Sequence, residues 1–261
     1  MTFDTLDIEH KGLAAWVWLN RPDVHNAFDE MLIAQLTETL RALGQAPGVR
    51  AVVIAGRGKS FSAGADLRWM QRQGQASEQE NLADARRLAE LFRVLAACEK
   101  PTIARVHGAA MGGGMGLAAA CDICVASTDA TFATSEVRLG LVPGVISPYV
   151  IRAIGARQAY RYFQTAERIS AAKAQEIGLA HEVSMPAQLD QMVQQIIDAL
   201  VLGGPEAQVA STELIRRTTR GPLDDSLIED CAQSIAKIRA SGQAKEGLAA
   251  FLDKRAPNWE V

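Results

Sequence analysis

Three consecutive glycines, Gly112 to Gly114, constrain this chain more than any other feature of its sequence. They lie between an apolar run, Thr102 to Val106, that predicts a strand, and a segment of small apolar residues, Met115 to Asp122, that predicts a helix. The first N–H groups of a helix have no acceptor within the helix, and glycine leaves them uncovered. The glycines therefore predict a place where backbone N–H groups can hold a negative charge.

A second turn of small residues, Phe61 to Leu67, precedes the glycines by about fifty residues. It also predicts a passage from a strand into a helix. Two such turns can direct two N–H groups at one oxygen atom, which is the arrangement of an oxyanion hole. The alternative is that the glycines only permit tight helix packing.

The charge balance of the chain argues against some classes of partner. The 261 residues carry a formal net charge of −3 and give a pI of about 5.9, so we expect no general affinity for nucleic acid or an anionic membrane surface. The segment from Met1 to His10 has no basic region followed by an apolar stretch, and no apolar run reaches about 18 residues. A cytoplasmic location is the expectation.

Cys121 and Cys124 form a CxxC pair, which can indicate a metal or redox site. No second such pair and no nearby pair of histidines completes a set of four ligands. Both cysteines lie in an apolar stretch, so we predict that they are buried as small hydrophobic residues, and we expect no metal.

Apolar periodicity in the first half of the chain predicts alternating strands and helices. The predicted strands are Leu13–Leu19, Ala51–Ala55, Thr102–Val106 and Asp122–Ala126, and the predicted helices are Asp29–Leu43 and Asn81–Ala97. Such alternation with short apolar strands indicates an α/β fold with a largely parallel sheet that is covered on both faces.

From Val145 onward, strand patterns nearly vanish and helical spacing dominates. The predicted helices are 156–165, 171–177, 188–201, 205–218, 223–241 and 245–254. We therefore expect a core over residues 1–195 and a helical C-terminal region over residues 196–261, which is suited to oligomerisation.

Several short motifs, taken in order, resemble the enoyl-CoA hydratase/isomerase (crotonase) family. The resemblance implies a crotonase-like spiral of ββα units with a helical C-terminal region, assembled as a homotrimer or a dimer of trimers. The motifs are Leu19-Asn20-Arg21-Pro22, Asn26-Ala27, Phe61 to Leu67, Gly112 to Gly114, Cys121-Asp122, Ser135 to Pro143, and Phe251 to Arg255.

For activity, the resemblance implies a coenzyme A thioester whose carbonyl oxygen is held by the N–H groups of Ala65 and Gly113. Glu136 corresponds to one of the two catalytic glutamates of the hydratases, and the alternative is a surface glutamate in a salt bridge. A carboxylate in a dry acyl pocket has a raised pKa, which suits acid–base chemistry near neutrality. Coenzyme A is part of the substrate, so no separate cofactor is expected.

The resemblance also implies contacts to the coenzyme A moiety. For His25 an exposed turn beside the pocket is the alternative, and for Lys254 a solvated surface lysine. The matching positions are His25, Ala27, Ala63, Asp66, Leu67, Phe251 and Lys254.

Gly116 departs from the family pattern, because hydratases with paired glutamates carry the second one at this position. Two carboxylates therefore cannot share the acid and base roles here. A single glutamate suits a syn addition in which Glu136 performs both proton transfers, and it also suits a double-bond isomerase.

The run from Gly144 to Val150 resembles the bacterial 3-methylglutaconyl-CoA hydratases of leucine breakdown and the isohexenylglutaconyl-CoA hydratases of acyclic terpene breakdown. Their substrates carry a free carboxylate, which Arg68 can meet with its guanidinium; a surface or phosphate-facing arginine is the alternative. Gly116 and Tyr149 complete the predicted substrate pocket.

The sequence thus predicts a lyase that hydrates a branched glutaconyl-CoA thioester. The alternatives are an isomerase with one glutamate and a non-catalytic binder of acyl-CoA or RNA.

Overall fold

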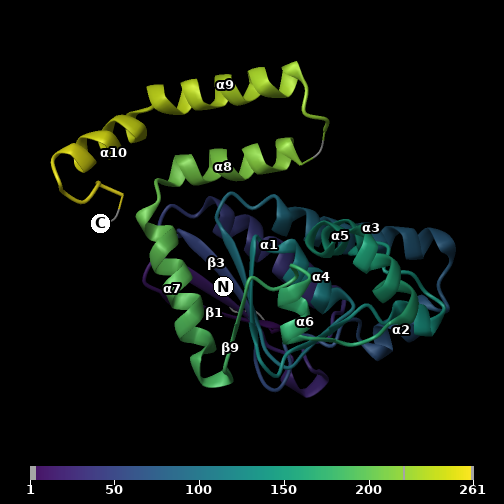
Figure 1. The fold of residues 1–261 in the computed structure, drawn as a ribbon. Helices are drawn as coiled ribbons and strands as arrows, with labels where there is room; N and C mark the ends of the chain where they lie inside the picture. The colour runs from purple at the N-terminus through teal and green to yellow at the C-terminus, as the bar shows by residue number, and fades with distance from the viewer. Residues whose placement is uncertain (1–3, 220, 260–261) are drawn as a thin grey trace. The chain divides into compact units, whose positions relative to one another are not determined.

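The computed structural model describes residues 4–219 and 221–259 (Figure 1). The described chain divides into two compact units, with the boundary between Ile196 and Ile197. The first unit holds all the strands, and the second holds helices only. The α/β class predicted from the sequence is confirmed.

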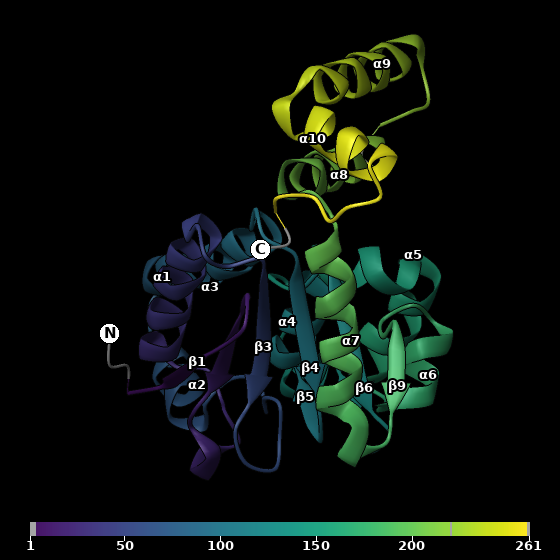
Figure 2. The same ribbon diagram turned by 90° about the vertical axis from the view of Figure 1, so that its left-hand side faces the viewer.

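A six-stranded sheet organises the first unit, with the order β1-β2-β3-β4-β6-β9. Only β1 runs antiparallel to its neighbour, and the other pairs are parallel. Figure 2 shows β3, β4 and β6 side by side. The strands are β1 (Leu6–Lys11), β2 (Ala14–Leu19), β3 (Ala51–Gly56), β4 (Thr102–Val106), β6 (Ile123–Ser127) and β9 (Glu182–Ser184).

The two faces of β2 are covered in different ways because alternate side chains of a strand point to opposite faces. Ala15, Val17 and Leu19 belong to the main hydrophobic core, together with residues of α1 (Glu30–Gln45) and α3 (Glu78–Ala96). On the opposite face, Trp16 and Trp18 stack with ring centroids 5.7 Å apart. The sheet is therefore buried on both sides, as the apolar strands predicted.

Both covering helices begin at a polar cap. The Asp29 side chain accepts a hydrogen bond from the Leu32 N–H and caps α1. Ser77 and Glu80 form a capping box at the start of α3, in which each side chain bonds the other residue's backbone N–H. These caps determine where the two helices begin. For α3, the helix begins three residues before the predicted start at Asn81.

A second, smaller sheet carries the glycine triplet, and it corrects the predicted strand. Its order is β5-β7-β8, with β5 at Ala109–Met111, β7 at Thr131–Ala133 and β8 at Ile169–Ser170. The strand that leads into α4 (Gly113–Ala120) is β5, not Thr102–Val106, which forms β4 in the main sheet. Three residues are too few to give a periodic signal, so the sequence did not reveal β5.

The later helices agree with the predicted ones except at α5 (Ser147–Thr165). This helix begins nine residues before the predicted start and bends at Gly155, which has a non-helical φ of 74°. The remaining helices are α2 (Leu67–Gln73), α6 (Ala171–Glu176), α7 (Leu189–Leu202), α8 (Pro205–Thr218), α9 (Asp225–Ala240) and α10 (Gly242–Leu252), with 3-10 turns at Pro22–Val24, Glu136–Leu139 and Pro186–Gln188.

The cysteines of the CxxC pair are buried thiols in the hydrophobic core, as predicted. Burial raises the pKa of the Cys124 thiol to about 12, so it stays protonated near neutral pH. Within residues 4–219 and 221–259, no cluster of three or more His, Cys, Asp or Glu side chains is placed to hold a metal ion. No helix in this part of the chain is both long and apolar enough to cross a membrane.

The side chain of Asn26 forms hydrogen bonds to the backbone of three separate segments next to the turn from Phe61 to Leu67. It is fully buried, and its side-chain oxygen accepts the Arg21 N–H at 2.8 Å. Its side-chain nitrogen donates to the carbonyl oxygens of Arg57 and Ser60, both at 2.8 Å. Its backbone has a φ of 55°, a left-handed conformation that asparagine tolerates better than most residues. This side chain therefore sets the position of the loop that follows Ser60.

Replacing Asn26 with alanine is expected to lower the free energy of unfolding by about 2–4 kcal/mol, because buried backbone groups lose their partners. Urea denaturation followed by circular dichroism measures the change. Asn81→Ala is the matched control, since Asn81 is half-buried and makes longer bonds of 3.1 and 3.3 Å to Gln73 and Ala76. An equal loss in both variants would contradict this role of Asn26.

Candidate active site

The two turns of small residues meet in the structure. The Ser62 N–H donates to the Ala109 carbonyl at 2.9 Å, and the Met111 N–H donates to the Ser62 carbonyl at 2.9 Å. Gly64 has a φ of +87°, and a Cβ built on it would lie 2.7 Å from the Met111 carbonyl oxygen. Only glycine satisfies both conditions, so the close approach of the turns depends on Gly64.

Ala65 in the first turn and Gly113 in the second each have a backbone N–H group without an acceptor among the described residues. In the first turn, the Phe28 N–H donates to the Gly64 carbonyl, and the Asp66 N–H donates to the Phe28 carbonyl. Neither of these bonds uses the N–H group of Ala65, which lies between Gly64 and Asp66. In the second, the bond from Gly116 N–H to the Gly112 carbonyl is the first of α4, so Gly113 N–H stays open. Two open donors thus flank the contact between the turns, as an oxyanion hole requires.

Gly113 is fixed in place by Phe28. A Cβ on Gly113 would lie 2.2 Å from Cε2 of Phe28, which is fully buried. The ring therefore packs directly on the backbone of the first turn of α4. A side chain at position 113 would push this turn away from Ala65.

Glu136 lies against the glycine turn because β5 and β7 pair in parallel. This pairing continues in the bond from the Gly112 N–H to the Ala133 carbonyl at 2.8 Å. Three residues later, Glu136 begins a 3-10 turn, and its Oε1 is 3.2 Å from the position of a Cβ on Gly112. The structure therefore brings Glu136, Gly113 and Ala65 together.

The Glu136 carboxylate is poorly solvated. Its Oε2 is buried and has no hydrogen-bond partner among the described residues. Burial raises the pKa of this carboxyl group, and the residue's own N–H offsets the rise only in part. The surface salt bridge that was the alternative is absent from the described chain, and a buried carboxylate without a partner suits acid–base work.

The position of Gly116 is closed rather than open. A Cβ on Gly116 would lie 2.3 Å from Cγ2 of Ile146 and 3.0 Å from Cε1 of Phe92. Tyr149 is half-buried, and its ring packs on Phe92 with centroids 5.7 Å apart. Apolar side chains therefore fill the space next to Gly116, and Gly116 adds no space of its own to a substrate pocket.

Asp66 is occupied by structural contacts. Its carboxylate caps α2 by accepting the N–H groups of Arg68 and Trp69, and it pairs with Arg21 at 3.2 Å. Burial alone would raise the pKa of Asp66, but these N–H bonds and the Arg21 charge outweigh it and hold the pKa below its usual range. Its backbone is also bonded, because the Asp66 N–H donates to the Phe28 carbonyl and the Asp66 carbonyl accepts from the Met70 N–H, both at 2.8 Å.

The neighbouring residues of α2 point outward. Leu67 is 79% exposed, and Arg68 is also exposed. The Arg68 guanidinium forms no ion pair or hydrogen bond with the described residues, whereas Arg72 on the next turn pairs with Glu30 at 2.9 Å. Arg68 is therefore available to an external carboxylate or phosphate.

The remaining predicted contacts of this unit lie around one loop. His25 is exposed with a φ of 53°, and its Nδ1 is 3.1 Å from Oγ of Ser60. The Ala63 N–H donates to the His25 carbonyl at 2.8 Å, so both residues flank the turn that holds Ala65. Ala27, two residues after His25, is buried.

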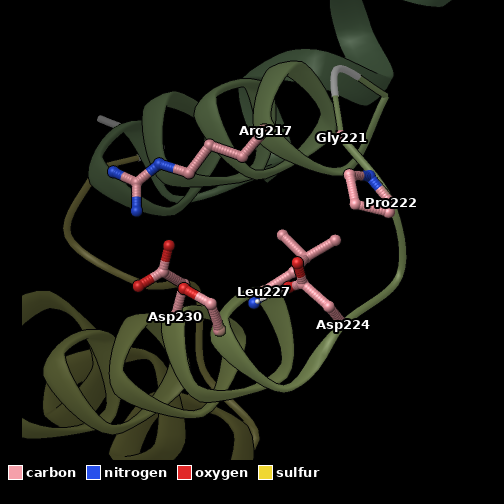
Figure 3. A pocket seen from close by; sticks show the side chains of 7 residues that line it. Arg217, Gly221, Pro222, Asp224, Leu227 and Asp230 are labelled. Carbon is pink, nitrogen blue, oxygen red and sulfur yellow. Dashed lines mark hydrogen bonds between the residues drawn. The ribbon is translucent and has the colours of Figure 1, made fainter.

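Phe251 and Lys254 belong to the C-terminal unit. Phe251 is 81% exposed, and Lys254 has a φ of 55° just after the end of α10. The same unit has an open hollow between α8 and α9, where Arg217 lies opposite Asp230 and Asp224 lies at the other end near Pro222 (Figure 3). All three side chains are exposed, and Arg217 already pairs with Glu213, so the hollow lacks the buried groups of an active site.

Sequence analysis did not identify the residues that support the site. Asn26 and Arg21 were noted only as parts of motifs, although both fix the loop around Ala65. Phe28 and Ile146, which pack on the glycines of α4, are ordinary apolar residues in the sequence. The partners are at least thirty residues apart in three of these contacts, so local patterns carry no signal for them.

Residues 9–261 match the model of the family described as enoyl-CoA hydratase/isomerase. The chain belongs to this family. The enoyl-CoA hydratase/isomerase family consists of enzymes of coenzyme A thioesters, and this protein is therefore an enzyme whose substrate is an enoyl-CoA thioester.

Individual relatives agree with this assignment over nearly the whole chain. A crystal structure of an enoyl-CoA hydratase from Shewanella pealeana is 41% identical, covers 98% of this chain and 96% of its own, and superposes with a TM-score of 0.96. Crotonyl-CoA hydratase of Syntrophomonas wolfei is 32% identical over 99% of both chains. The 2,3-dehydroadipyl-CoA hydratase of Escherichia coli is 33% identical over 93% of both chains.

The burial of Glu136 predicts how stability depends on pH. Because its pKa is raised in the folded state, the folded protein binds this proton more tightly than the unfolded chain. The stabilising effect of that proton is present below the ordinary carboxyl pKa of 4.5 and is lost as pH rises through the folded pKa. Glu136→Gln is therefore expected to be more stable than the parent near neutral pH and equally stable below that value, as measured by urea midpoints across pH.

Glu80→Gln is the control of opposite sign. Hydrogen bonds from Ser77 lower the pKa of Glu80, so its carboxylate stabilises the folded state above the ordinary carboxyl pKa. This variant is expected to lose stability near neutral pH. If Glu136→Gln also lost stability there, the desolvation of Glu136 would be refuted.

Proposed function

We propose that this enzyme adds water to the double bond of a branched glutaconyl-CoA thioester, such as 3-methylglutaconyl-CoA or isohexenylglutaconyl-CoA. The observation that carries the proposal is the buried, unpartnered Oε2 of Glu136, which lies close to two turns whose N–H groups at Ala65 and Gly113 are open. Related hydratases, including those for crotonyl-CoA and for the dicarboxylic 2,3-dehydroadipyl-CoA, support hydration as the reaction.

In the proposed mechanism, the thioester oxygen accepts hydrogen bonds from the N–H groups of Ala65 and Gly113. As the oxygen of water bonds to the β-carbon, electrons of the double bond move toward the thioester, whose oxygen becomes negative. The two donors stabilise this enolate, and losing one such donor costs about 10²–10³ in rate. Coenzyme A is carried by the substrate, so the proposed reaction uses no separate cofactor.

Glu136 performs both proton transfers in this proposal. Its carboxylate accepts a proton from the attacking water and then delivers a proton to the α-carbon on the same face, which restores the thioester carbonyl. A raised pKa favours this exchange near neutral pH, because the group is then both a usable base and a usable acid. The apolar contact at Gly116 agrees with a site that uses a single carboxylate.

Arg68 is proposed to bind the second carboxylate of the substrate. Its guanidinium is exposed and makes no pair within the described chain, and it follows Ala65 by three residues. Tyr149 contributes to the acyl pocket beside Phe92. The coenzyme A moiety is proposed to contact His25, Ala27, Ala63, Asp66 and Leu67, with Phe251 and Lys254 contributing from the C-terminal region.

Double-bond isomerisation is the second candidate, because one carboxylate also suffices to move a proton between the α- and γ-carbons. The apolar side chains that fill the space next to Gly116 agree equally well with isomerisation and with hydration by a single glutamate. The two reactions differ in whether oxygen from water enters the product. We further propose assembly through residues 196–261 as a homotrimer or a dimer of trimers, with sedimentation velocity as its measurement.

The first test follows the loss of conjugated enoyl-thioester absorbance with crotonyl-CoA, 3-methylglutaconyl-CoA and isohexenylglutaconyl-CoA in isotope-labelled water. We expect rapid loss with the branched dicarboxylic substrates and labelled oxygen in the product, detected by mass spectrometry. Glu136→Gln is expected to reduce kcat by about 10²–10⁴-fold. Loss of conjugation without labelled oxygen would establish the isomerase instead.

The role of Arg68 is tested by substrate comparison. Arg68→Ala is expected to raise KM for the dicarboxylic substrate by about 10–100-fold, which corresponds to the loss of one charged hydrogen-bonded contact. KM for crotonyl-CoA, which lacks the second carboxylate, stays unchanged. Arg72→Ala is the control, because this exposed arginine is already paired with Glu30. A similar rise with both substrates would assign Arg68 to coenzyme A.

A further inference from the structure

His107 lies where the two segments that lead into the site begin to pair. Its carbonyl accepts the Phe61 N–H at 2.9 Å, and Ser62 continues the pairing with bonds to Ala109 and Met111, also at 2.9 Å. These segments run directly into the two turns of small residues. The pairing that begins at His107 therefore sets how the two turns lie relative to each other.

The loop before Phe61 packs closely on His107 and the residue that follows it. Gly108 has a φ of +57°, and a Cβ built on it would lie 2.2 Å from the Lys59 carbonyl oxygen. The His107 side chain adds a second contact, because its Nε2 lies 2.9 Å from the Gly58 carbonyl oxygen. A carbonyl can only accept a hydrogen bond, so Nε2 carries the proton. The imidazole thus holds Gly58 three residues before the first turn begins.

Arg105 fixes the orientation of the imidazole ring. Its Nη1 lies 3.0 Å from Nδ1 of His107, and its Nε donates to Oδ1 of Asp190 at 2.7 Å. A guanidinium can only donate, so Nδ1 is the acceptor and the ring is neutral. Burial lowers the pKa of His107, and the Arg105 charge adds to this shift. The Gly58 carbonyl and the charges of Asp129 and Asp190 oppose the shift only in part.

Asn26 and His107 hold the same loop in different ways. The Asn26 side chain donates to the carbonyls of Arg57 and Ser60, and it accepts the Arg21 N–H. These bonds join the loop to the segment that follows β2. Of these two side chains, only that of His107 joins the loop to the segment that leads to the glycine triplet. The position of the first turn relative to the second therefore depends on the His107 side chain.

We propose that His107 is a positioning residue for the oxyanion hole, because its Nε2–H holds the loop before Ala65 against the segment that leads to Gly113. The inference rests on the proposed function, since it takes the N–H groups of Ala65 and Gly113 as the donors to the thioester oxygen. His107 acts through the backbone and does not touch the substrate.

The test is the infrared carbonyl band of a bound saturated thioester, because hydrogen bonds to the carbonyl oxygen lower its stretching frequency. Butanoyl-CoA with a heavy carbon isotope at the thioester carbonyl is the ligand, at a saturating concentration. In the parent, we expect the band of the bound ligand below that of the free ligand. His107→Ala is expected to return the band toward the free value. His107→Gln keeps an N–H donor at a similar reach and is expected to retain most of the shift.

His181→Ala is the matched control, because the Nδ1 of His181 accepts the Cys124 N–H at 3.1 Å in the main sheet and makes no bond to either turn. It is expected to leave the band unchanged. The same band in the parent and in folded His107→Ala would overturn the inference. An equal return of the band in His181→Ala or in His107→Gln would overturn it as well. Where His107→Ala fails to fold, His107→Phe, which has a ring without an N–H group, is measured by the same criterion.

Turnover provides a second readout. With an enoyl-CoA that the parent hydrates, His107→Ala is expected to lower kcat by about 10–100-fold, because a displaced donor costs less than a missing one, while KM stays close to that of the parent. A lower melting temperature with an unchanged band and an unchanged kcat would make His107 a residue of the fold alone and overturn the inference. Failure of the proposed function is recognised separately, as absent hydration of every enoyl-CoA by the parent, since butanoyl-CoA has no double bond to hydrate.

Discussion

The close contact between the turns at Gly64 and Gly112 is the constraint on which the site depends. Gly64 approaches the Met111 carbonyl so closely that a Cβ would collide with it, and only its left-handed backbone makes this possible. The contact places the open N–H groups of Ala65 and Gly113 on neighbouring turns. The buried ring of Phe28 packs on the backbone of Gly113, so the hydrophobic core supports the N–H donor of Gly113.

A second constraint is the burial of Glu136. Its carboxylate has one buried oxygen without a partner among the described residues. Burial removes solvation from the Glu136 carboxylate, and its pKa rises for that reason. At Gly116 the space is filled by Ile146 and Phe92, so the proposed acid–base chemistry rests on Glu136.

Much of the site was predictable because its residues follow one another in short motifs. The turn at Phe61 to Leu67 and the glycine triplet predicted helix starts, and α2 and α4 begin there. The short strand β5 and the early start of α5 were not predictable, since three residues give no period and the bend at Gly155 interrupts the helical pattern. The role of the Asp66 carboxylate in capping α2 and pairing with Arg21 was also not predicted, because Arg21 is 45 residues away in the sequence.

The sequence by itself determined the α/β class and the two turns of small residues, because each depends on residue types at short spacing. Glu136 as the candidate acid–base residue was implied by the resemblance of its motif to the family. Only the tertiary structure decided what lies beside Gly116. Ile146 is thirty residues further along the chain, and its contact with α4 arises from the packing of α5 on α4. A glycine in a sequence can mean open space or a neighbour pressed against the backbone, and the two are distinguished only by the side chain that packs there.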